Sequence, residues 1–175
     1  GLPNTVNTLI INNSGLQGNN SILFNKNISI QSDLSILQGV MDLQTFTSNN
    51  TSSAGTMIIV QNAKFRIGGN NSLLNVVNNY STYNIDIESN IEFYGGSGTT
   101  QIISDLPLNL INGLGNVLLT NGGTKIAADP LLIRGNLINY NPSILNVSRM
   151  DALQVQKNVI NESQIHNQGV LEIGN

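Results

Sequence analysis

Residues 21–46 read SILFNKNISIQSDLSILQGVMDLQTF, and this stretch determines the predicted fold. Large apolar residues recur in it at every sixth position: Ile22, Ile28, Leu34, Val40 and Phe46. A strand of about four residues and a tight corner together take about six residues. The spacing therefore predicts short strands joined by corners, because a helix would place apolar residues three and four positions apart.

The same spacing returns later in the chain. Near the C-terminal end the positions are Leu153, Val159, Ile165 and Leu171. Ile102 and Leu108 repeat the step, and Ile126, Ile133, Leu137 and Ile144 follow at intervals of four to seven. Three such sides close one coil of about 18 to 22 residues. We therefore predict a single domain over residues 1–175, an all-β, single-stranded parallel β-helix (β-solenoid) that is a fragment of a longer repeat protein.

Eight runs rich in strand-forming residues fit this reading. They are 8–11, 27–30, 56–60, 84–87, 90–94, 100–103, 116–119 and 169–173. The alternatives are a β-sandwich, which would turn every 8 to 12 residues or so, and an irregular all-β domain. The hexads lack a small residue at a fixed place and are broken by insertions, so we predict a right-handed coil.

The composition limits the kinds of partner. Only 10% of the residues are charged, whereas asparagine occupies 30 positions. Neutral amides can hydrogen-bond along a row of stacked coils, where like charges would repel. The seven Lys and Arg residues are scattered singly, so no basic stripe is available for nucleic acid. No run of about eighteen apolar residues predicts a membrane-inserted segment, and cysteine is absent.

The stretch 55–104 carries a resemblance. It contains GTMIIVQNAKFRIGGNNSLL, then YSTY, SNIEFYG and GTTQIIS. It resembles β-solenoid repeats of giant type IX-secreted cell-surface proteins of Bacteroidota, and residues 33–47 and 122–147 resemble the flanks of those repeats. The proline that follows the paired leucines in those repeats is missing after Leu74. The resemblance implies export, display at the cell surface, and roles in adhesion, gliding or biofilm contact, with the signal peptide and sorting domain outside this segment.

Asp86 and Glu88 are the best candidates for chemistry. On a strand they would share one face about 7 Å apart. With Glu92 or Asp105 on a neighbouring coil, they could serve an inverting glycosidase or, less readily, bind calcium. The simpler interpretation is that Ile85 and Ile87 face the core and both acids face water.

Two other features were weighed for binding. His166 is the single histidine, and it is most simply an outward-facing strand residue, so neither a zinc site nor a Ser-His-Asp triad is predicted. The segment 68–83 breaks the six-residue spacing and holds two of the four tyrosines. It is either a projecting partner-binding loop or a wide corner packed on its own Leu73, Leu74 and Val76.

The sequence therefore predicts a structural or adhesive module of a secreted or cell-surface bacterial protein. It would act as a rigid spacer or as a binding surface for a cell, glycan or matrix. Its partners would be neighbouring coils of the same chain and possible surface ligands, with no cofactor and no catalytic or metal-binding residues. The alternative is a carbohydrate-active β-helix enzyme, or its non-catalytic binding remnant.

Overall fold

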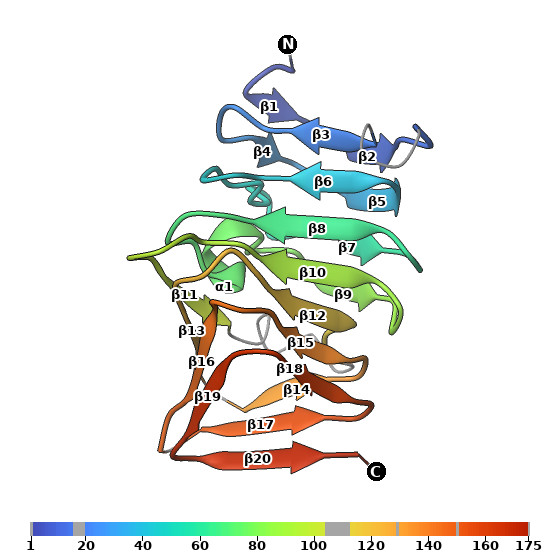
Figure 1. The fold of residues 1–175 in the computed structure, drawn as a ribbon. Helices are drawn as coiled ribbons and strands as arrows, with labels where there is room; N and C mark the ends of the chain where they lie inside the picture. Colours follow the sequence, from blue (N-terminus) through green and yellow to red (C-terminus); the bar gives the residue numbers. More distant parts are fainter. Residues whose placement is uncertain (1, 16–19, 104–112, 129, 150, 175) are drawn as a thin grey trace.

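The computed structural model describes residues 2–15, 20–103, 113–128, 130–149 and 151–174. Every strand pair in this part of the chain is parallel. The coils stack on one another from the N-terminus to the C-terminus (Figure 1). The predicted all-β parallel solenoid is confirmed, and the antiparallel sandwich is excluded. The hand of the coil stays a prediction.

One side of the solenoid is a continuous seven-stranded sheet, which we call the long sheet. Its strands are β3 (Ser21–Leu23), β6 (Val40–Asp42), β8 (Lys64–Ile67), β10 (Asn90–Phe93), β12 (Asn116–Leu119), β15 (Leu137–Asn139) and β18 (Val159–Asn161). Because each strand pairs only with the coils before and after it, the sheet runs along the length of the stack.

Shorter sheets form the other two sides of each coil. The side that follows the long sheet comprises β1 (Thr5–Val6) and β4 (Ser29–Ile30), then β11 (Thr100–Ile103), β13 (Thr124–Ala127), β16 (Ile144–Val147) and β19 (Gln164–Asn167). The side that precedes it comprises β2 (Leu9–Asn12), β5 (Leu34–Gln38), β7 (Thr56–Ile59) and β9 (Thr82–Ile85), then β14 (Leu131–Ile133), β17 (Ala152–Val155) and β20 (Val170–Ile173). Three sides per coil is the predicted arrangement.

The coil length varies more than the spacing predicted. Ala152 pairs with Val170, 18 positions later, whereas Lys64 pairs with Asn90, 26 positions later. The predicted 18 to 22 residues hold from β12 onward and are too few for most earlier coils, whose corners contain extra residues. Leu108, one of the positions in the predicted spacing, lies outside the described residues.

Apolar side chains stack in rows inside the coils. Along the long sheet Met41, Phe65 and Ile91 occupy equivalent positions, and all three are fully buried. Val40 points outward beside Lys64 in the same register, so the six-residue spacing is wrong there by one residue. The spacing thus sets the length of a side but does not assign each inward position.

The segment 68–83 is a packed corner and not a projecting loop. It contains the single helical turn α1 (Leu73–Val76), and Ser72 caps it by accepting a hydrogen bond from the Asn75 N–H. Tyr80 and Tyr83 are buried, their rings meet edge to face, and their hydroxyls donate to the carbonyls of Ser48 and Val77. Within the described residues, no helix is long and apolar enough to cross a bilayer.

Asparagine and glycine act at the corners as the composition predicted. Gly39 adopts φ +83°, and a Cβ there would lie 2.5 Å from the Asn13 carbonyl oxygen, so only glycine fits. A ladder of amides also links successive coils, since Asn136 donates to the Asn116 Oδ1 and Asn158 donates to the Asn136 Oδ1, both at 3.0 Å. The amides therefore satisfy one another along the stack.

Lys125 is a cation buried inside the solenoid. Its side chain occupies an inward position of β13, and its Nζ donates to the carbonyls of Gly95 at 2.9 Å and Gly122 at 2.6 Å. Burial lowers the pKa of Lys125 from its ordinary value to about 8. The ammonium group is thus held by carbonyl oxygens, and no carboxylate pairs with it among the described residues.

We expect Phe65→Ala to destabilise the solenoid by about 3–5 kcal/mol, because the ring fills an inward row between two other buried residues. Chemical denaturation monitored by circular dichroism measures this. The control is Leu23→Ala, since Leu23 lies on the same sheet with 61% of its surface exposed. It should change the free energy of unfolding by less than about 0.5 kcal/mol. Equal effects of the two substitutions would contradict the assigned inward and outward faces.

We expect stability to rise between pH 8 and pH 10.5, because Lys125 loses its proton at about pH 8 when folded and at 10.5 when unfolded. The unfolded chain binds more protons in that window, so raising the pH favours the folded state by up to about 3 kcal/mol. Denaturation curves across this range measure the slope, and Lys125→Met should flatten it. An unchanged slope in that variant would rule out Lys125 as the titrating group.

Candidate functional site

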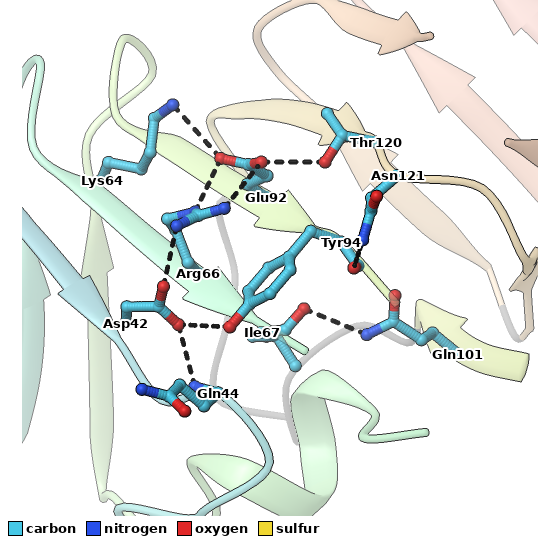
Figure 2. Close-up of polar contacts among 10 residues, drawn as sticks. All are labelled: Asp42, Gln44, Lys64, Arg66, Ile67, Glu92, Tyr94, Gln101, Thr120 and Asn121. Atoms are coloured by element: carbon cyan, nitrogen blue, oxygen red, sulfur yellow. Dashed lines mark hydrogen bonds and ion pairs between the residues drawn. The ribbon is translucent and has the colours of Figure 1, made fainter. Parts of the chain in front are cut away.

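The outer face of the long sheet carries a row of paired charges. Asp42 on β6, Arg66 on β8 and Glu92 on β10 occupy one register position on three successive coils. Arg66 donates to the Asp42 Oδ2 at 2.8 Å through its Nη1 and to the Glu92 Oε2 at 3.1 Å through its Nε. We call these three residues the charged ladder (Figure 2). The guanidinium group bridges two carboxylates that would otherwise face each other across one coil.

Two further side chains complete the contacts of Glu92. Lys64, two residues before Arg66 on the same face of β8, approaches the Glu92 Oε2 at 3.2 Å. Thr120, after β12, donates its hydroxyl to the Glu92 Oε1 at 2.8 Å. Figure 2 shows Lys64, Arg66 and Thr120 converging on this carboxylate from three coils. Glu92 is therefore held on both oxygens.

These contacts fix the charge state of Glu92. Burial alone would raise the pKa of this carboxyl, since the ionised form loses water. The hydrogen bond from Thr120 and the charges of Lys64 and Arg66 outweigh that effect and hold the pKa of Glu92 below its ordinary value. Glu92 is consequently an ionised acceptor at neutral pH.

Tyr94 packs against the other end of the ladder. Its hydroxyl donates to the Asp42 Oδ1 at 2.5 Å, and the Arg66 guanidinium lies 4.3 Å from the centre of its ring. Burial and the Asp42 carboxylate raise the pKa of Tyr94, so the phenol stays protonated and keeps donating. The ring and the two carboxylates together hold Arg66 in one orientation.

The charged ladder separates two open grooves. The first, which we call the lysine groove, has a volume of about 450 Å³. It is lined by Asn20, Ser21, Gly39, Val40, Asn62, Lys64, Arg66 and Glu92. The second, of about 340 Å³, lies on the side of Tyr94 and is lined by Asp42, Gln44, Thr45, Gly68, Gly69 and Tyr94. Both grooves are polar, as a site for a hydroxyl-rich or charged ligand would be.

The predicted acidic pair is not arranged as the glycosidase hypothesis requires. Strand β9 ends at Ile85, so Asp86 and Glu88 lie in a corner and not on one strand face. The Asp86 carboxylate accepts a hydrogen bond from the Glu88 backbone N–H at 2.8 Å. Glu88 is exposed and contacts Gln61 and Lys157.

The other predicted partners of this pair do not join it. Glu92 belongs to the charged ladder, and Asp105 lies outside the described residues. His166 is an exposed residue of β19, as predicted. In the described part of the chain, no group of three or more histidine, aspartate or glutamate side chains is placed to hold a metal ion.

The sequence prediction missed the charged ladder. Its members lie 24 and 26 positions apart, so they stack only because two coils have those lengths. The signal was present as single charges in a chain with few of them, at spacings close to one coil. Reading it required coil lengths that the six-residue spacing underestimated.

The comparisons with known proteins add no relative, since the chain matches no protein-family model, no curated protein and no solved structure. The fold itself defines the class, which is a three-sided parallel β-solenoid carrying a mixed-charge ladder on its long sheet.

We expect Glu92→Gln to lower the free energy of unfolding at pH 7 by about 3 kcal/mol, because it leaves Lys64 and Arg66 without their shared carboxylate. Glu92 has a lowered pKa when folded, so its contribution is present above its unfolded value near 4.5 and is lost as the pH falls below that value. The parent and the variant should therefore converge in denaturation curves as the pH falls below 4. The exposed Glu162 provides the control, since Glu162→Gln should follow the parent at each pH.

Proposed function

We propose that the chain is a structural and adhesive module of a secreted, surface-displayed bacterial protein. It acts as a stiff rod whose long sheet presents a binding face to a glycan, a matrix or another cell. The observation that carries this proposal is the continuous seven-stranded parallel sheet, which holds the charged ladder and both grooves on one rigid surface.

Stiffness is supported by the bonds between coils. Each strand of the long sheet is hydrogen-bonded to the coils on both sides, except at the two ends. Ion pairs from Arg66 and the amide ladder of Asn116, Asn136 and Asn158 add side-chain links across successive coils. Bending the rod would stretch several of these links at once, which suits a spacer.

Binding without turnover is supported by the state of the ladder carboxylates. A glycosidase needs one carboxyl group with a raised pKa as its general acid. The charges around Glu92 lower its pKa, and the Asp42 carboxylate is occupied by Arg66, Tyr94 and the Gln44 backbone N–H. Both groups therefore suit structural ion pairing better than proton transfer.

Surface display is supported by the resemblance of residues 55–104 to repeats of type IX-secreted Bacteroidota proteins. An outer surface rich in asparagine and poor in charge is consistent with this role, since amides and hydroxyls form hydrogen bonds with sugars and with stacked neighbours. Adhesion, gliding or biofilm contact would then be the setting in which the rod works.

A glycan array probed with the purified chain, combined with an assay for released reducing sugar, tests this function. We expect binding to a subset of surface glycans and no release of reducing ends above a buffer control. Release that depends on Glu92 would establish the enzyme alternative. Absence of binding to any glycan or extracellular matrix component would refute the adhesive role.

A further inference from the structure

We infer that the lysine groove binds a carboxylate group of an acidic glycan, with Lys64 and Arg66 as its donors. The inference depends on the proposed adhesive function and names the chemical class of its ligand. It rests on the hydrogen-bonding capacity that the charged ladder leaves unused, on the exposure of each group, and on the groove beside them.

The two cations of the ladder region have spare donors. A guanidinium group has five N–H donors and an ammonium group has three. Arg66 uses three of its N–H groups, for Asp42 and for both oxygens of Glu92. Lys64 uses one, for Glu92. Four N–H groups on two adjacent cations therefore remain for a ligand.

The carboxylates, by contrast, have little capacity left. Glu92 accepts two hydrogen bonds on each oxygen, from Arg66, Lys64 and Thr120. Its side chain is 10% exposed and that of Asp42 is 4% exposed, against 32% for Lys64 and 28% for Arg66. The anions therefore lie beneath the cations, and the groove presents positive N–H groups to solvent.

The groove offers hydrogen-bonding groups of another kind next to these donors. Asn20, Ser21 and Asn62 supply amides and a hydroxyl to its lining. Such groups both donate and accept, as sugar hydroxyls do. A volume of about 450 Å³ accommodates small-molecule ligands. A uronic acid residue, with one carboxylate and several hydroxyls, matches this combination of cations and neutral polar groups.

The donors are also preorganised. Arg66 is held by Asp42, Glu92 and the ring of Tyr94, so little of its conformational freedom is left to lose on binding (Figure 2). The two carboxylates behind it reduce the net attraction for an anion. Binding of a single sugar is therefore expected to be weak, and a polymer with many carboxylates would bind adjacent molecules on a cell surface through multivalency.

Isothermal titration calorimetry with a tetragalacturonate tests this assignment, with the same oligosaccharide methyl-esterified at every carboxyl group as the uncharged probe. We expect the acidic probe to bind and the ester to bind at least fivefold more weakly. Lys64→Gln should weaken binding of the acidic probe by at least fivefold, and Lys64→Arg should restore most of it. Raising the salt from 20 to 200 mM should weaken the acidic probe alone.

Lys157→Gln is the matched control, because it removes the same charge from a cation of similar exposure that pairs with Glu88 in a corner away from the groove. It should leave the affinity unchanged, and thermal unfolding should confirm that each variant is folded. Equal affinity for acid and ester, an unaffected Lys64→Gln variant, or no binding of the acidic probe at millimolar concentration would each overturn the inference. If the glycan array yields ligands that Lys64→Gln still binds, the adhesive function stands and only the groove assignment fails.

Discussion

The backbone of each coil is completed by the backbone of its neighbours, and this constraint governs the rest of the molecule. All strand pairs among the described residues are parallel, and each inward residue lies over its counterpart in the next coil. Ile36 and Ile59, for example, are equivalent residues of adjacent strands and are both buried. Side chains therefore form rows along the rod, inside and outside alike, and every row is a choice between apolar packing, amide pairing and charge pairing.

This repetition explains which features the sequence could predict. A six-residue spacing identifies short sides, because only stacked short strands place an aliphatic residue inward so often. It cannot decide between adjacent candidates such as Val40 and Met41, since both are apolar and only the corner geometry at Gly39 determines which faces inward. Asp86 was misplaced on a strand for a similar reason, as its carboxylate forms a local turn with the Glu88 N–H and ends β9 early.

The candidate site was harder to predict because it depends on long-range register. Asp42, Arg66 and Glu92 look like isolated charges until the coil lengths of 24 and 26 residues bring them together. Those lengths are set by corners of irregular sequence, such as the one that folds Tyr80 and Tyr83 into the core. Local pattern determines the sides of a solenoid, whereas the corners determine which side chains become neighbours.

The charged ladder and the amide ladder solve one problem in different ways. In a stack of coils each outward position meets its equivalents above and below at about 4.8 Å, so identical charges would repel. Asparagine avoids this repulsion with a group that both donates and accepts, as at Asn116 and Asn136. The charged ladder avoids it by alternating sign from coil to coil, which also specifies register, because a slip of one residue would turn Arg66 toward the apolar interior. Where coil length varies most, an alternating ladder that fits in only one register gives the stack a definite alignment, and it leaves its cations at the surface.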